Sequence, residues 1–260
     1  NRSSQAQVSN IAIDQISFQV GGYEAKYGQA QSGIVNVTTK GGSSSYSVLF
    51  DAATSTYLDN FGFNEYSGSI SGPIIPGMSN HTIFISGERG WYQDSRPSAI
   101  PLDFPSIGQS YDSRPNFPAD VWRFSGRTTH GFGDFSVRLS ALVNTRNASV
   151  YNHRQVKNDS QFFDRFSEDN YSFAGRISQT ISASSYWNVT LGYKVYNYKR
   201  FNPFFEDDLM AYGDSTIWAN KLGVTLIANG DRTATTDETG IFRPYGYSTG
   251  LYQKREDAAY

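Results

Sequence analysis

The feature that most constrains this fold is a strict period-two alternation of side chains in several long segments. From Phe135 to Asn144 every odd-numbered residue is apolar, and the even-numbered residues are mostly polar. Trp187 to Val195 repeats this pattern, and Tyr171 to Ile181 follows it less strictly. A period of two places successive side chains on opposite faces of an extended chain. Each segment therefore predicts a β-strand with one apolar side and one polar side.

Four earlier segments and one later segment extend the series. They run over 46–57, 66–72, 82–92 and 121–130, and a further strand begins near Tyr252. The facing of 82–92 is ambiguous because Ile83, Phe84 and Ile85 are consecutive apolar residues. The sequence thus predicts seven strands and the beginning of an eighth.

The connections between these segments alternate in length. Residues 73–80, 131–134 and 183–185 are short connections, whereas 94–120, 154–170 and 201–245 are long and irregular. Only the first connection, 58–65, is short where a long one is expected. Outer-membrane barrels have tight periplasmic turns and long external loops. The pattern favours a transmembrane antiparallel β-barrel, and the alternative is a soluble β-sandwich with binding loops.

Composition supports a chain of half-apolar strands. Aromatic residues make up 15 % of the 260 residues although the hydrophobic fraction is only 38 %, a balance that suits one-sided strands with aromatic girdles. No apolar run approaches the roughly 18 residues of a membrane helix. The chain has no cysteine, which excludes disulfides and thiolate metal sites, and its net charge of −2 argues against a nucleic-acid partner.

The N-terminal part carries a compact motif. A short strand over 11–20 ends at a glycine turn, and the stretch 23–42 then reads YEAKYGQAQSGIVNVTTKGG. The glycines allow unusual backbone angles or close approach, and 34–39 has the β-branched residues of a buried strand. The pair Gly41-Gly42, followed by three serines, reads as a hinge between two units.

This order of elements resembles the end of the plug in TonB-dependent outer-membrane receptors. The motif residues are Gly21, Gly22, Tyr27, Gly28, Ser32, Gly33, Asn36 and Lys40. The turn at 72–77 and Glu88 in the following Phe-rich strand also resemble the family, most closely its Oar-like and SusC-like groups with a carboxypeptidase-regulatory-like domain. The resemblance covers about residues 10–95 by motif, and the remainder only by pattern.

The resemblance implies an all-β fragment of a larger protein. Residues 1–42 would be the C-terminal part of the plug domain, and 43–260 the first seven to eight strands of a 22-stranded barrel in the bacterial outer membrane. A TonB box further upstream would engage the TonB–ExbB–ExbD complex. Other partners would be outer-membrane lipid and a surface lipoprotein.

The implied function is active transport of a large solute, such as an oligosaccharide, a peptide or a chelate, across the outer membrane. The alternative is a surface receptor, an adhesin or a secretion-associated barrel that keeps the plug fold without transporting. A TonB box upstream would favour transport.

The sequence offers no catalytic set, so neither an enzyme nor a cofactor is predicted. The three histidines, His81, His130 and His153, lie far apart and lack metal-binding spacing. The acidic run 206–208 has the oxygen ligands that calcium prefers, but such runs are more often solvated loop surfaces. No metal site is therefore predicted.

Two groups of side chains are candidates for contact with a solute. Basic residues on the polar sides of four successive strands would face the barrel lumen, where they would attract anions or pair with plug carboxylates. They are Arg123, Arg127, Arg138, Arg146, Arg176 and Lys194. Aromatic and arginine residues in external loops would recognise a ligand, pack the loops together or form the outer girdle. The candidates are Trp91, Tyr92, Arg96, Tyr111, Arg114 and Tyr151.

Overall fold

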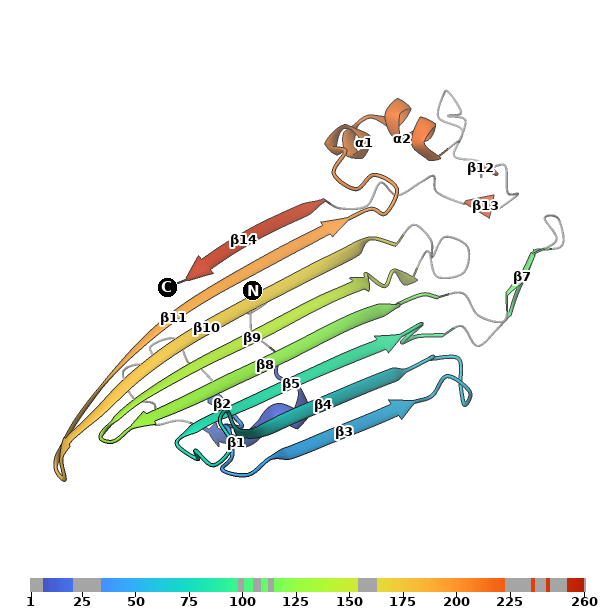
Figure 1. Cartoon of the computed structure of the whole chain (residues 1–260). Coiled ribbons are helices and arrows are strands. Elements are labelled where there is room, and N and C mark those ends of the chain that lie inside the picture. Colours follow the sequence, from blue (N-terminus) through green and yellow to red (C-terminus); the bar gives the residue numbers. More distant parts are fainter. Residues whose placement is uncertain are drawn as a thin grey trace.

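The computed structural model describes a single large antiparallel sheet and a smaller N-terminal unit. The described residues are 7–20, 34–97, 101–104, 109–111, 115–153, 163–222, 235–236, 242–243 and 252–259. The large sheet has eight strands in the order β14-β11-β10-β9-β8-β5-β4-β3, so each strand pairs with its neighbours in the chain apart from short inserted elements. Figure 1 shows these strands side by side in one layer of long ribbons, with neighbouring strands running in opposite directions.

The strands of the large sheet are long, and most of them exceed the predicted segments. They are β3 (Ser47–Thr54), β4 (Asn64–Pro73), β5 (His81–Tyr92), β8 (Ala119–Phe132), β9 (Phe135–Ser149), β10 (Arg165–Ser182), β11 (Ser185–Phe201) and β14 (Gln253–Ala259). The seven predicted strands and the eighth near Tyr252 are all present. The all-β antiparallel prediction is therefore confirmed.

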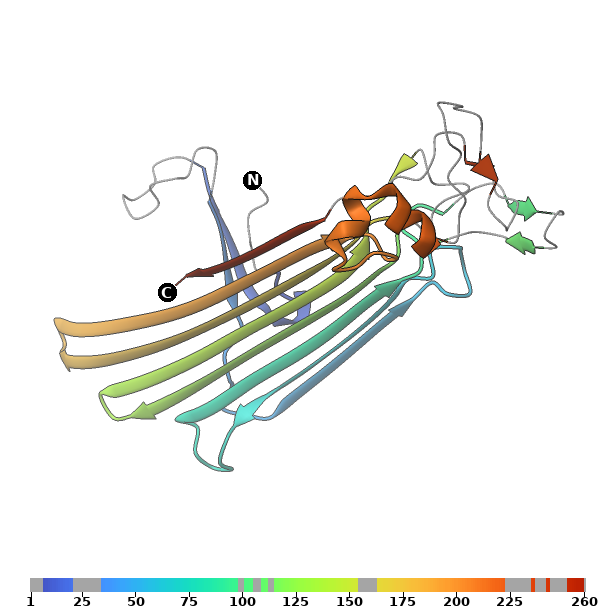
Figure 2. The ribbon, with the colours of Figure 1, turned by 90° about the horizontal axis from the view of Figure 1, so that it is seen from above.

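The N-terminal residues form a separate unit. A short 3-10 helix, η1 (Asn10–Ala12), leads into β1 (Ile13–Gln19), which pairs with β2 (Ile34–Thr39) in a two-stranded antiparallel sheet. The second sheet is not hydrogen-bonded into the large one. Figures 1 and 2 show it on one side of the large sheet, and in Figure 2 it projects away from that sheet.

Short and long connections lie at opposite ends of the large sheet. Two hairpins have two-residue turns, 133–134 and 183–184, and 74–80 closes the same end. Gly133 has a φ of 64°, a conformation that glycine adopts without strain. The nine-residue connection 55–63 lies at the long-loop end, as the alternation requires.

The long connections carry small elements that the strand pattern did not predict. They are β6 (Leu102–Phe104), β7 (Gln109–Tyr111), α1 (Leu209–Gly213), α2 (Ser215–Leu222), β12 (Thr235–Thr236) and β13 (Phe242–Arg243). Within the described ranges, no helix has the length and apolar character needed to cross a membrane.

The large sheet has an apolar face that is not covered. On this face Val48 is 74 % exposed and Leu191 is 73 % exposed. A sandwich would bury such side chains against a second sheet, and none of the described residues does so. Buried apolar residues instead gather on the opposite, polar face near the long loops, where Ala119, Ala148 and Phe166 pack together.

Candidate functional site

The apolar face forms a band that ends in aromatic residues. On β10 it runs from Ile181 to Tyr171, and on β11 from Trp187 to Tyr193. Trp122 ends the corresponding run on β8. Beyond these aromatic rings, toward the long loops, the same face turns polar, with Asp120, Asp169 and Asn197. Phe132, Phe135 and Ile181 lie at the opposite, short-turn border.

Two arrangements mark the long-loop border of this apolar band. The guanidinium of Arg89 lies 4.9 Å from the Trp122 ring centroid, and its Nε lies 3.1 Å from an Asp120 oxygen. Trp91 is also on this side, whereas its neighbour Tyr92 faces the opposite side and packs against the Ala119 cluster. These two candidate ligand contacts therefore do not belong to one surface.

The register of the large sheet is staggered in one direction. His81, the first residue of β5, pairs with His130, and β8 continues to Phe132 before its turn. Phe135 pairs with Gln179, and β10 continues to Ser182 before the next turn. Each turn thus lies further along the strand direction than the one before it. Closing a sheet into a barrel requires a stagger of this kind.

The polar face carries charges of both signs. Arg123 forms an ion pair with the buried Glu88, and Arg146 lies 3.7 Å from Glu168. These carboxylates belong to the sheet itself, on β5 and β10. These two contacts differ from the expected pairing with plug carboxylates, because both partners lie in the large sheet.

The N-terminal unit is held on the polar face by hydrogen bonds. The guanidinium of Arg127 donates to the Thr39 carbonyl oxygen and to Thr39 Oγ1, both at 2.6 Å. The Ser9 hydroxyl donates to Glu88, and Arg123 donates to Gln7 Oε1 at 3.0 Å. We call this set of contacts the Arg127–Glu88 latch, after Arg127 of β8 and Glu88 of β5. These two residues and Arg123 form the side of the latch in the large sheet, and Gln7, Ser9 and Thr39 form the side in the N-terminal unit.

The segment between the two units lies close to the large sheet. The Ser43 backbone N–H donates to Ser71 Oγ at 2.9 Å. A Cβ atom on Gly42 would lie 2.5 Å from the Ile83 nitrogen, so only glycine fits here without displacing β5. The predicted hinge at Gly41-Gly42 is thus a place of close approach.

Most motif residues of the N-terminal unit lie outside the described residues. These are Gly21, Gly22, Tyr27, Gly28, Ser32 and Gly33. Asn36 lies in β2 opposite Ser17, and the Lys40 backbone N–H donates to the Ala12 carbonyl at 2.8 Å.

At the long-loop end, a buried carboxylate organises the base of the loop 93–118. Asp94 is fully buried and accepts backbone N–H bonds from Arg96, Asn116 and Phe117 at 2.8, 2.9 and 3.0 Å. The Asn116 side chain returns a bond to the Arg96 carbonyl at 2.9 Å. The two ends of the loop are therefore tied together at one point.

Arg96 and Tyr151 are the two predicted ligand contacts that the fold brings together. The Arg96 guanidinium lies 4.6 Å from the Tyr151 ring centroid, and Tyr151 packs edge-on against the buried Phe163. This contact joins the loops after β5 and β9. It favours the packing alternative for these two side chains. Arg114 lies outside the described residues, and so does the side chain of Tyr111 in β7.

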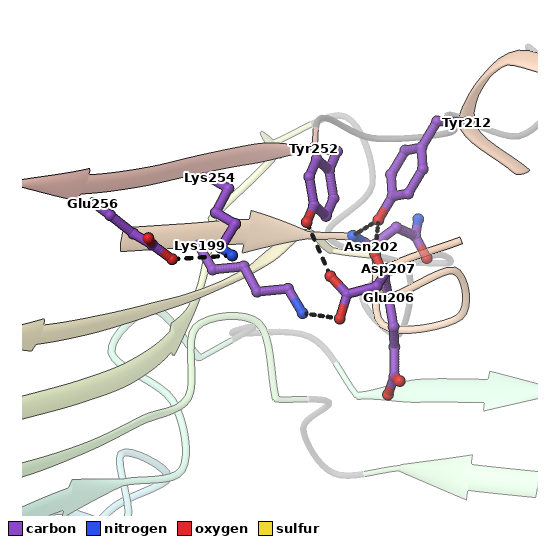
Figure 3. A network of polar contacts seen from close by, with 8 residues as sticks. All are labelled: Lys199, Asn202, Glu206, Asp207, Tyr212, Tyr252, Lys254 and Glu256. Carbon is purple, nitrogen blue, oxygen red and sulfur yellow. Dashed lines mark hydrogen bonds and ion pairs between the residues drawn. The ribbon is translucent and has the colours of Figure 1, made fainter. Parts of the chain in front are cut away.

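The acidic run in the last long loop is held by neighbouring basic and phenolic groups. Figure 3 shows Lys199 and Tyr252 directed at Asp207, with distances of 2.8 and 2.9 Å. These hydrogen bonds lower the pKa of the Asp207 carboxyl. Asp208 lies 3.1 Å from Lys221, which likewise lowers its carboxyl pKa. Within the described ranges, no group of three or more potential ligands gathers as a metal site would require.

The loop beside this network has a small core of its own. Phe205 is buried and packs edge-on against Tyr212, whose ring also contacts Tyr252. The Tyr212 hydroxyl accepts a bond from the Asn202 N–H at 2.8 Å and donates to the Glu206 carbonyl at 3.0 Å (Figure 3). The segment 202–212 is thus fixed to the ends of β11 and β14.

Two of the three histidines meet across strands, which spacing along the chain did not predict. His81 in β5 and His130 in β8 are register partners, and their Nδ1 atoms lie 3.2 Å apart. Their separation of 49 positions hides this pair from any local motif. His81 lies just before the predicted strand 82–92, whose facing was ambiguous, so the sequence carried no signal for this pair. His153 lies at the other end of the sheet, against Tyr151.

Comparison with protein families, with curated proteins and with solved structures finds no match for this chain.

Proposed function

We propose that this chain is part of an active transporter of the bacterial outer membrane. In this proposal the large sheet is a section of a transmembrane β-barrel, and the N-terminal unit is the end of a plug within the lumen. The observation that carries it is the difference between the two faces of the large sheet. One face is apolar and uncovered, and the other holds the N-terminal unit through the Arg127–Glu88 latch.

The dimensions of the apolar band support a place in a bilayer. The ten residue-to-residue steps from Tyr171 to Ile181 span about 33 Å along a strand at 3.3 Å per step. Tilted by about 40°, as barrel strands are, that length covers roughly 25 Å of membrane thickness. The aromatic residues at both borders of the band fit the interfacial girdles of such a barrel.

The latch supports a plug that can be released. Its hydrogen bonds connect the N-terminal unit to two adjacent strands, while in the described residues β1 and β2 form a strand ladder only with each other. A unit whose described strands share no backbone ladder with the large sheet can leave the wall without breaking that sheet. A TonB-driven rearrangement that admits a large solute needs such a boundary.

A conductance experiment tests the plug. The full-length protein in a planar lipid bilayer should be closed, and a variant lacking everything up to Gly42 should form a large open pore. Closed behaviour of the deleted form, inserted in equal amount, would overturn the plug proposal.

The coupling to TonB is tested separately, by co-purification of the full-length protein with the C-terminal domain of TonB. Binding supports active transport. An open pore after deletion without TonB binding would instead indicate a non-transporting surface receptor.

A further inference from the structure

The cross-strand pair of His81 and His130 has the geometry of a metal chelate. Two ligands of a tetrahedral ion, each about 2.0–2.1 Å from it, lie about 3.3 Å apart. The two Nδ1 atoms are separated by 3.2 Å, and the rings are tilted by 48°. A single ion can therefore bind both nitrogens with only a small movement of the rings.

The backbone around the pair is held in register. The Gly131 N–H donates to the Asn80 carbonyl at 2.8 Å, and the Asn80 side chain donates to the Gly131 carbonyl at 3.0 Å. The Phe132 ring packs edge-on against His81 at 5.1 Å. These contacts fix the positions of both imidazoles relative to each other before any ligand binds, which reduces the ordering cost of chelation.

Both imidazoles remain partly accessible at the short-turn end of the sheet. An ion bound there would keep water in its remaining positions, as catalytic and open zinc sites do. Imidazole nitrogen suits zinc, nickel and copper better than magnesium or calcium.

We propose that His81 and His130 together bind one divalent transition-metal ion, with zinc, nickel or copper as the fitting class and water as the other ligands. Both nitrogens donate lone pairs to the ion, so the ring that otherwise donates from Nδ1 gives up that proton to solvent and takes one at Nε2, and both imidazoles stay neutral. The bound ion would join β5 to β8 beside their turns. This inference does not depend on the transport proposal.

Copper binding to the full-length protein in detergent tests the site. In the wild-type protein, Cu²⁺ should give an electron paramagnetic resonance signal split by two equivalent nitrogens. His81→Asn or His130→Asn should each weaken this component of binding at least about tenfold, because the chelate effect is lost. His153→Asn is the matched control and should leave the signal unchanged.

A second measurement uses the unaltered protein, so that a folding defect in a variant does not decide the result. Zn²⁺ should protect His81 and His130, but not His153, from diethyl pyrocarbonate, as read by peptide mass spectrometry. Equal modification of all three histidines with and without Zn²⁺ would overturn the proposal. A copper signal unaffected by the His81 and His130 variants would overturn it as well. The 3.2 Å contact would then be only a hydrogen bond between the two rings.

Discussion

At the scale of single residues, the position of one side chain on its strand decides which solvent it meets. Leu191 and Thr190 are adjacent in β11 but lie on opposite faces of the sheet. The same holds for Trp91 and Tyr92 in β5, which were expected to share one recognition surface. Which residues share a surface therefore depends on the alternation of side chains along a strand, and neighbours in the sequence lie on opposite faces.

Replacement of Leu191 by arginine should hinder assembly in the membrane. Its side chain is 73 % exposed on the apolar face, and a charge near mid-bilayer costs about 2–4 kcal/mol. Outer-membrane abundance of the full-length protein measures the effect, and Thr190→Arg on the polar face is the control. Equal abundance of the two variants would contradict the assignment of faces.

Replacement of Asp94 by alanine should loosen the loop 93–118. Three backbone N–H groups would lose a buried acceptor, and an unsatisfied buried donor costs about 1–3 kcal/mol. Hydrogen exchange of Arg96, Asn116 and Phe117 should become faster. Asp94→Asn, which retains one acceptor oxygen, should show a smaller effect. Unchanged exchange in the alanine variant would show that the loop is held elsewhere.

At the scale of elements, side-chain contacts, and not backbone ladders, attach the N-terminal unit and the loop 202–212 to the large sheet. The N-terminal unit meets β5 and β8 through Arg127 and Glu88, and the loop 202–212 meets β11 and β14 through Asp207. The first junction joins charged side chains of the sheet to hydroxyl, amide and carbonyl groups, and the second joins a carboxylate to a lysine and a phenol. Each can therefore open without unfolding a strand.

Arg127→Met should weaken the seating of the N-terminal unit while leaving the sheet intact. The substitution removes two hydrogen bonds from a charged donor, each worth about 1.5–3 kcal/mol, and keeps an apolar stem of similar length. We expect normal outer-membrane abundance with increased entry of vancomycin. Arg176→Met, on the same face in β10, is the control. Wild-type permeability in the Arg127 variant would argue against the latch.

Acid should release the junction at Asp207. Hydrogen bonds from Lys199 and Tyr252 lower the pKa of this carboxyl, so its contribution is complete above the ordinary carboxyl pKa. That contribution is lost as the pH falls below about 4 and through the lowered pKa. A spin label at Gly213, where a Cβ meets no neighbour within 4 Å, should become more mobile on acidification.

Two comparisons make the acid experiment specific to Asp207. In Asp207→Asn the label should already be more mobile at neutral pH, and the acid step should shrink to what Asp208 and Lys221 contribute. A label that became less mobile as the pH fell would contradict the sign of the pKa shift.

At the scale of the whole molecule, the described sheet has two open edges and one uncovered apolar face. In the described part of the chain, β3 and β14 each pair with a single neighbour. Unpaired edges invite pairing with other chains, and barrels remove them by closure. The proposed remainder of the barrel would supply the missing neighbours.

The 260-residue chain alone should therefore aggregate in plain buffer and fold only in detergent or lipid. Size-exclusion chromatography and circular dichroism in both conditions provide the measurement. A soluble monomer with a cooperative thermal transition would contradict the barrel proposal, and would favour a fold that covers the apolar face.

The sequence alone predicted the strands of the large sheet, the faces of most of them and the end at which the long loops lie. Those properties are local, because a period of two and the length of a connection are written in consecutive residues. It did not predict the helices at 209–222, which have no counterpart in that pattern. It also left the orientation of 82–92 open, which the register then resolved by placing Ile83 and Ile85 on the apolar face.

Only the tertiary structure decided which distant side chains meet. Arg127 reaches Thr39, Arg96 stacks on Tyr151, and His81 faces His130, each across long stretches of chain. Such pairs depend on strand register, and a shift of one residue would send every partner to the other face. Register is set by the whole sheet, so it cannot be read from any segment by itself.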